Sequence, residues 1–295
     1  MKPIENGFVP ALGTPLDKDG NLMSESFMKQ IKDQISAGAK AILCMGSMGI
    51  GPYIRTDVFP DVVEAAVEAA AGRVPVLVGA MDTSVARVKD KVTSIEHLDY
   101  DALVFTPPFY EACNNAEVKS FYKKISSITD RNIFLYDHPY TSQAKITYDM
   151  VLELLSSMPN LKGIKSNDII MFRKLMSDNA VPKDFELVFS GLDVFDVAYK
   201  SGYTKCLDGM LACTPHNTKM LFDSLANDDY ASAREYLNNI LSLRDLFVVY
   251  DLWPCFTASM NMLGYEGDFA PDYSLCITKE AYDAVEKEMN RIGEI

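Results

Sequence analysis

A lysine and a tyrosine each stand at the end of a short apolar run, and both residue types can take part in carbonyl chemistry. Lys165 ends the run LKGIK, and Tyr136 ends the earlier run NIFLY. One-sided burial lowers an ammonium pKa from about 10.4 toward the range in which a neutral amine attacks a carbonyl carbon. A phenol beside the amine can move the protons. The alternative is a lysine that reaches solvent at the rim of a sheet and has no chemical role.

Short β-rich runs alternate with amphipathic segments up to about residue 227, which predicts a repeated β/α unit. Most runs are apolar on both faces, as parallel strands covered by helices must be. Segments such as SESFMKQIKDQISAG and DMVLELLSSM carry apolar residues at helical spacing between them. The predicted strands cover residues 8–12, 41–45, 74–78, 102–105, 133–136, 161–165, 186–189 and 206–210.

Eight such units predict an α/β fold of the TIM (β/α)8 barrel type rather than an open doubly wound sheet. The first predicted turn, ALGTPLDKDG, contains no GxGxxG, and no GxxxxGK[ST] occurs anywhere, so nucleotide binding has little support. Residues 228–295 are predicted to form extra helices. No Pro/Gly/Ser-rich linker separates them from residues 1–227, so we expect them to pack on the barrel within one structural unit.

Composition and charge narrow the classes of partner. The chain has 295 residues, is 48% apolar and carries a net charge of −13, which disfavours nucleic acid and anionic membrane surfaces. No apolar run approaches the roughly 20 residues of a membrane span, and MKPIENGFVP does not resemble a secretory signal. The six cysteines show no CxxC spacing and are expected to be reduced thiols. These features predict a cytoplasmic protein.

The histidines give no indication of a metal centre. His97, His138 and His216 are isolated, and none has a second histidine at helical spacing. A site built from distant carboxylates stays open on this evidence. We therefore expect neither a metal nor another cofactor.

Active sites of TIM barrels lie at the carboxyl ends of the strands, and polar or small residues gather at those positions here. Each has an architectural alternative, because glycines serve tight turns and serines cap helices. The candidate site residues are Thr14 after the first strand, Gly46, Ser47 and Met48 after the second, Tyr110 after the fourth, His138 after the fifth, Ser190, Gly191 and Asp193 after the seventh, and Gly209 in the eighth.

Several segments together resemble the dihydrodipicolinate synthase and N-acetylneuraminate lyase superfamily, the pyruvate-type class I aldolases. They are GFVPALGTPLDKDGNL, AILCMGSMGIGPYI, VPVLVGA, LVFTPPFY, IFLYDHP and LKGIKSND, in the order and at the intervals of that family. The resemblance covers the chain from Gly7 to about Pro215. A lone lysine or a lone GxxG would be weak evidence, whereas their order and spacing are specific.

The resemblance implies catalytic roles for four residues. Lys165 matches the lysine that forms a Schiff base with the substrate ketone, and Tyr136 matches the tyrosine that shuttles protons. Ser47 matches a hydroxyl that links this tyrosine to a second one, and Tyr110 matches that second tyrosine, which enters the site from a neighbouring subunit. A homotetramer built as a dimer of dimers is therefore implied.

Departures from the family pattern bear on the substrate. Met48 stands where a second hydroxyl is usual, and Ile50 stands where the GxxGE motif has its glutamate. Thr141 lies near the position of the arginine that dihydrodipicolinate synthases carry, and Val194 replaces the glutamate of sialic acid lyases. Asp137, His138 and Tyr140 form a different polar rim, which we expect to contact the second substrate.

The sequence thus predicts a Schiff-base lyase or aldolase that acts on a pyruvate-like 2-oxo acid, including a 2-keto-3-deoxy sugar acid. Efficient dihydrodipicolinate synthase activity is not expected, since a threonine does not replace a planar cation. The alternative is a barrel that has lost catalysis and binds or senses a 2-oxo acid. A metal-dependent aldolase is the third hypothesis.

Overall fold

The computed structural model describes residues 1–295 and contains one sheet of eight parallel strands. Neighbouring strands are hydrogen-bonded to each other in the order β1-β8-β7-β6-β5-β4-β3-β2. A single parallel bridge between Ala11 and Leu43 joins the two end strands of this order. The prediction of a TIM barrel is confirmed. The strands are β1 (Gly7–Pro10), β2 (Ile42–Cys44), β3 (Val76–Gly79), β4 (Ala102–Phe105), β5 (Asn132–Tyr136), β6 (Leu161–Ser166), β7 (Glu186–Phe189) and β8 (Lys205–Asp208).

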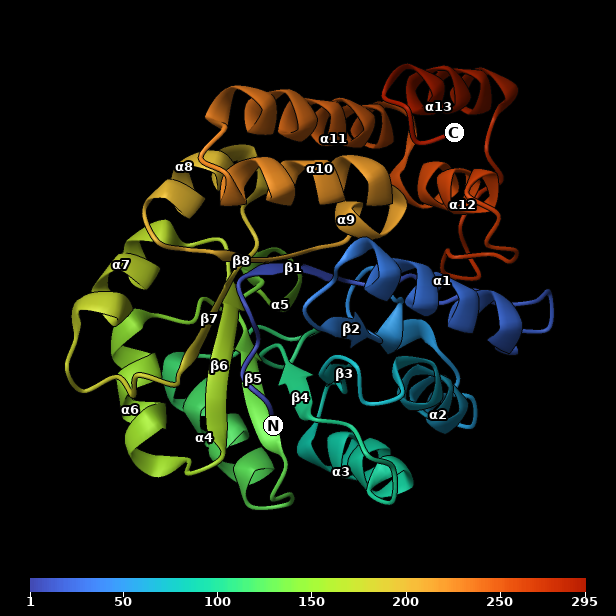
Figure 1. Cartoon of the computed structure of the whole chain (residues 1–295). Helices are drawn as coiled ribbons and strands as arrows, with labels where there is room; N and C mark the ends of the chain where they lie inside the picture. Colours follow the sequence, from blue (N-terminus) through green and yellow to red (C-terminus); the bar gives the residue numbers. More distant parts are fainter.

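Helices surround the strands, as Figure 1 shows. Eight of them follow the eight strands in turn: α1 (Ser24–Ala37), α2 (Phe59–Ala70), α3 (Val85–Ile95), α4 (Asn115–Ser126), α6 (Tyr148–Ser157), α7 (Ile169–Ser177), α8 (Phe195–Lys200) and α10 (Pro215–Ala226). Short helical turns occupy several loops at the carboxyl ends of strands: η1 (Gly51–Tyr53), α5 (Pro139–Ser142), η2 (Leu192–Val194) and α9 (Met210–Cys213).

The last strand is shorter than the sequence predicts. The apolar run suggests a strand to Met210, whereas β8 ends at Asp208 and Met210 already begins α9. The reason is local: the backbone N–H of Met210 donates to a carboxylate oxygen of Asp208 at 2.9 Å, and this bond starts the helical turn. The predicted end of this strand was therefore wrong by two residues.

Apolar side chains form two layers. A small cluster fills the barrel interior and includes Val9, Val104, Phe134 and Leu207, while a much larger cluster lies between the strands and the helices. Gly163 in β6 makes room for the interior ring, since a Cβ there would meet Phe134 at 2.4 Å. Packed side chains thus fill the barrel interior. A ligand can therefore enter only at the mouth, which is the end of the barrel at the carboxyl ends of the strands.

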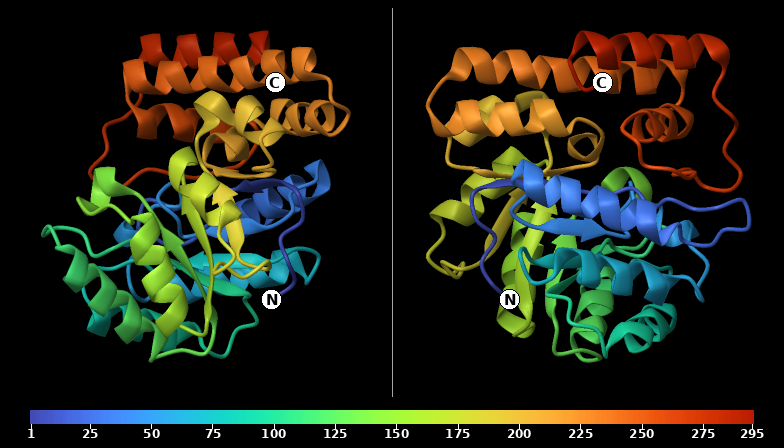
Figure 2. Two further views of the ribbon diagram at one scale, coloured as in Figure 1. Left: turned by 90° about the vertical axis from the view of Figure 1, so that its left-hand side faces the viewer. Right: turned by 45° about the vertical axis from the view of Figure 1, so that its right-hand side comes forward.

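Three more helices follow the barrel: α11 (Tyr230–Tyr250), α12 (Leu252–Met262) and α13 (Lys279–Arg291). Figure 1 places α11 beside α10 and α13 beside α12, and the turned views in Figure 2 agree. Asn217 at the start of α10 binds the chain end directly, because its side-chain amide donates to the Ile292 carbonyl at 2.8 Å. No helix of the chain combines the length and the apolar character needed to cross a bilayer.

Candidate active site

A cavity of about 380 Å³ opens at the carboxyl ends of the strands and contains the predicted lysine. Nine of the predicted site residues line it: Ser47, Met48, Tyr136, Asp137, His138, Tyr140, Lys165, Ser190 and Gly209. The other lining residues are Ala11, Pro139, Asn167, Asp208, Met210, Arg244 and Leu252. Residues from distant parts of the chain therefore meet at one opening, as the strand-end rule predicts.

Lys165 and Tyr136 face each other across neighbouring strands. They are register partners in β6 and β5, and each residue is 6% exposed. The lysine Nζ lies over the tyrosine ring at 4.1 Å from its centroid. No carboxylate pairs with this ammonium group, although the other well-buried lysine, Lys91, is paired with Asp82 at 3.0 Å. The amine is thus held by an aromatic face and is not held by an anion.

The residues that follow this pair are linked by a buried network. Asp137 accepts a hydrogen bond from the Ser166 hydroxyl at 2.7 Å and one from the Ile146 backbone N–H at 3.0 Å. Lys145 pairs with the same carboxylate and with Asp168 at 3.1 Å. Because the two linked residues directly follow the tyrosine and the lysine, the network fixes the ends of β5 and β6 relative to each other.

His138 stacks on Tyr136. Its ring centroid lies 5.1 Å from that of Tyr136 with an interplanar angle of 29°. Burial lowers the pKa of His138 to about 4, and the nearby charge of Lys165 acts in the same direction. The imidazole is therefore neutral at physiological pH and can both donate and accept a hydrogen bond.

Two charged residues that the sequence did not single out also line the cavity. Asp208 ends β8, and burial raises the pKa of its carboxyl group. Arg244 comes from the middle of α11, outside the barrel, and binds Asp193 through two contacts of 2.8 Å. The strand-end rule could have identified the aspartate, whereas nothing in the sequence indicates that a helix of the extension reaches the mouth.

The segment after β2 reaches the cavity through its side chains at only two positions, Ser47 and Met48. Gly46 stays outside and packs against Leu43. A Cβ at Gly209 would lie 2.0 Å from the Met48 side chain, so this glycine makes room for the methionine. The methionine thus occupies part of the mouth in place of the hydroxyl that the family pattern has here.

Thr14, Tyr110, Gly191 and Asp193 do not line the cavity of the isolated chain. The Thr14 side chain is fully buried, and its hydroxyl donates to the Gly49 carbonyl at 2.7 Å, so it supports the loop after β2. Tyr110 is 84% exposed and has a positive φ of 87°. The catalytic role of Tyr110 and the substrate-binding roles of the other three residues stay predictions.

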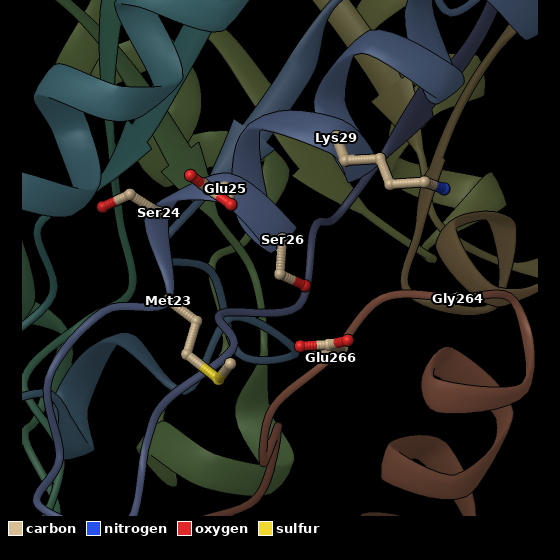
Figure 3. A pocket seen from close by; sticks show the side chains of 7 residues that line it. All are labelled: Met23, Ser24, Glu25, Ser26, Lys29, Gly264 and Glu266. Atoms are coloured by element: carbon tan, nitrogen blue, oxygen red, sulfur yellow. The ribbon is translucent and has the colours of Figure 1, made fainter.

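A second hollow of about 390 Å³ lies between the start of α1 and the loop after α12, and Figure 3 shows its side chains. Glu25 and Glu266 line it beside Lys29, whose ammonium group already pairs with Asp33 at 2.8 Å. It contains none of the predicted site residues. The hollow at the strand ends is therefore the candidate active site.

The fold and this cavity define a (β/α)8-barrel protein with a buried lysine at the mouth. Comparison with known families matches residues 5–291 to the dihydrodipicolinate synthetase family. The chain therefore belongs to this family, which confirms the resemblance seen in the sequence. The members of the family are lyases.

Individual relatives are distant. A 4-hydroxy-tetrahydrodipicolinate synthase of Exiguobacterium sibiricum is 27% identical over 234 residues, which are 78% of each chain. One from Rhodopseudomonas palustris is 28% identical over 244 residues, 82% of this chain and 81% of the relative.

Solved structures share the fold. Dihydrodipicolinate synthase of Thermotoga maritima has a TM-score of 0.88 at 20% identity, covering 99% of this chain and 100% of that one. YagE of E. coli K12, a prophage protein of the dihydrodipicolinic acid synthase family solved in complex with pyruvate, has a TM-score of 0.87 at 17% identity, covering 98% of both chains.

Proposed function

We propose that the protein is a Schiff-base-forming lyase or aldolase that acts on a pyruvate-like 2-oxo acid, including a 2-keto-3-deoxy sugar acid. The observation that carries the proposal is the environment of Lys165, a buried amine without a carboxylate partner, 4.1 Å from the ring centroid of Tyr136. The amine attacks the ketone carbon, and the tyrosine moves the protons that let water leave. In cleavage the C4 hydroxyl gives its proton to the tyrosine oxygen and its O–H electrons form the C4=O bond of the released aldehyde. The C3–C4 electrons form the C2=C3 bond of an enamine, and the C2=N electrons neutralise the iminium nitrogen.

The loop after β2 is proposed to bind the carboxylate of the 2-oxo acid. The Ser47 hydroxyl lines the cavity, and the family pattern assigns this segment to the carboxylate. With Met48 in place of a second hydroxyl, one side-chain donor is lost. Backbone N–H groups of the loop after β2 then carry more of the binding.

We further propose that the protein is not an efficient dihydrodipicolinate synthase, because its side chains offer no unpaired cation for a second carboxylate. Thr141 lies where the synthase arginine is expected, and its hydroxyl donates to the His138 carbonyl at 3.2 Å. Lys145 is held by Asp137 and Asp168, and Arg55 binds Asp57 at the surface. Arg244 reaches the cavity but is occupied by a carboxylate.

The family pattern also motivates a homotetramer and a cytoplasmic location as parts of this proposal. Tyr110 projects into solvent in the single chain, with 84% of its surface exposed. An exposed tyrosine in the loop after β4, held at an unfavourable φ, is consistent with a residue that completes the site of a neighbouring subunit. The neighbour's tyrosine would then join Ser47 and Tyr136 in one proton relay.

A panel of substrates tests the proposed activity. Purified protein is incubated with several 2-keto-3-deoxy sugar acids, and released pyruvate is measured with a coupled dehydrogenase. Condensation of pyruvate with aspartate semialdehyde is measured in parallel. We expect at least one sugar acid to be cleaved and Lys165→Ala to abolish the release. A kcat/KM of about 10⁴ M⁻¹s⁻¹ or more with the semialdehyde would contradict the proposed specificity.

A second candidate, a binder or sensor of 2-oxo acids without turnover, is favoured by one observation: Met48 fills part of the mouth where a hydroxyl is expected. This candidate predicts that pyruvate binds and that no member of the panel is turned over. Met48→Thr would restore the usual hydroxyl. Lyase activity in Met48→Thr, with none in the natural protein, would indicate that the natural protein binds 2-oxo acids without converting them.

A further inference from the structure

A carboxyl group at the end of β8 shares the cavity with the reactive lysine, and the mechanism above does not use it. Asp208 lines the same opening as Lys165, Tyr136 and Ser190. Its Oδ1 atom accepts the backbone N–H of Met210 at 2.9 Å. No side chain of the protein donates to this carboxyl group, whose partners are the backbone N–H groups of Met210 and Gly209, so it can accept a further bond from a bound molecule.

The other bases around the cavity are less suited to proton transfer. Asp137 is saturated by a lysine, a hydroxyl and a backbone N–H. His138 has a pKa of about 4 and is a weak base. Tyr140 is 92% exposed. Asp193 does not line the cavity and binds Arg244 with both oxygens.

The environment of Asp208 suits a general base. Burial raises its pKa, while the positive charges of Lys165 and Arg244 oppose that rise and favour the carboxylate. A carboxyl group with a raised pKa is better matched to proton transfer near neutral pH than an ordinary exposed one.

Imine chemistry needs a base at one further atom. Once the 2-oxo acid is bound to Lys165 as a protonated imine, the carbon next to the imine carbon must lose or gain a proton. The tyrosine is assigned to the protons of imine formation, and its ring lies against the lysine. The base for the carbon proton has so far no residue assigned to it.

We propose that Asp208 is a catalytic residue that carries the proton of this carbon. In the forward step the carboxylate takes a proton from C3 of the pyruvate imine, the C3–H electrons form a C2=C3 bond, and the C2=N electrons neutralise the iminium nitrogen. The product is an enamine and a protonated Asp208. In cleavage the step runs in reverse, since the carboxylic acid returns the proton to C3 of the enamine. The proposal rests on the proposed Schiff base at Lys165.

Exchange of the pyruvate methyl protons with solvent deuterium tests this role without knowledge of the natural substrate. Wild-type protein and Asp208→Asn are incubated with pyruvate in D2O, and loss of the methyl signal is followed by proton NMR. Borohydride reduction with pyruvate measures imine formation separately in the same samples. Asp223→Asn, the same change at an exposed carboxylate that pairs with Lys219 on α10, is the matched control.

We expect Asp208→Asn to keep borohydride trapping within a few fold of wild type and to lose exchange by a factor of about 10²–10⁴. Exchange within a few fold of wild type in this variant would overturn the role of Asp208. Asp208→Ser, which keeps an acceptor for the Met210 N–H, replaces the asparagine variant if that protein does not fold, and it is judged by the same criteria. Absence of trapping in the wild type would overturn the proposed function itself, together with this inference.

Discussion

The two sides of the cavity mouth are built in different ways. On the β5 and β6 side, Asp137 and Ser166 are joined by a buried hydrogen bond of 2.7 Å, and the tyrosine and lysine before them are in contact. On the β2 and β4 side, the Ser47 hydroxyl has no side-chain partner, and Tyr110 points into solvent with 84% of its surface exposed. One side is complete within the chain, whereas the other presents unpaired hydroxyls.

The contrast shows which parts of the site the single chain completes. Strand register and a satisfied polar network hold the lysine side in one geometry. The other side is formed by loops in which Met45, Ile50 and Tyr110 have positive φ angles, a conformation that costs about 1–3 kcal/mol for such residues. We therefore expect substitutions on the first side to act within each chain and substitutions on the second to depend on assembly.

We expect the largest effect on activity at Tyr136, on the β5 and β6 side of the mouth. Tyr136→Phe removes only a hydroxyl and should keep the fold, while imine formation with pyruvate slows by a factor of about 10²–10⁴. Stopped-flow absorbance or timed borohydride quenching measures the rate. Tyr282→Phe, an exposed change on α13, is the control. A rate within a few fold of wild type would remove the proton-shuttle role.

The next effect concerns the stability of the network on that side. Lys145→Met should lower the free energy of unfolding by about 3–5 kcal/mol, because it leaves the fully buried Asp137 side chain without its cation. Lys162→Met breaks the pair with Asp184, whose side chain is 70% exposed, and should cost at most about 1 kcal/mol. Urea unfolding compares the two. Equal losses would contradict the view that the network organises this half of the mouth.

His138, which stacks on Tyr136, predicts that the stability of the protein depends on pH. The pKa of His138 is about 4 in the folded chain and about 6.5 when unfolded, so the unfolded chain binds more protons between these values. Stability should therefore fall as pH decreases from 6.5 to 4, by up to about 3 kcal/mol from this residue. His138→Asn should flatten the decline measured by urea unfolding. The exposed His97 is the control, and an equal response in His97→Asn would contradict the assignment.

We expect the smallest effect on stability at Tyr110, on the β2 and β4 side of the mouth. Tyr110→Phe should leave the free energy of unfolding within about 0.5 kcal/mol of wild type, because the residue is exposed in the single chain. Its activity should nevertheless fall if the hydroxyl serves a neighbour. Sedimentation velocity paired with activity at a series of dilutions measures this, and full activity in a dilute monomer would exclude the shared site.

The sequence sufficed for the barrel because parallel strands buried on both faces give apolar runs that alternate clearly with helices. All eight strands were found, and the strand-end rule brought Lys165, Tyr136 and His138 to one cavity. The rule could not show that Thr14 turns into the protein to support a loop, since that depends on the direction of its side chain.

The remaining site residues were missed for different reasons. Arg244 lies far along the chain in a helix of the extension, and no local pattern indicates that α11 reaches the barrel mouth. Asp208 was counted as part of an apolar strand, although its carboxyl group was visible at the strand end. The network of Asp137 with Lys145 joins residues on either side of α5, a turn whose path local periodicity does not predict.

The central claim is that Lys165 forms an imine with a 2-oxo acid, and reductive trapping tests it most directly. The protein is treated with borohydride in the presence and absence of pyruvate, digested and analysed by mass spectrometry, with Lys165→Arg as the control. We predict that pyruvate adds its reduced mass to the peptide containing Lys165 and to no peptide of the arginine variant. An unmodified Lys165 peptide after reduction with pyruvate and every other 2-oxo acid of a panel would contradict the account.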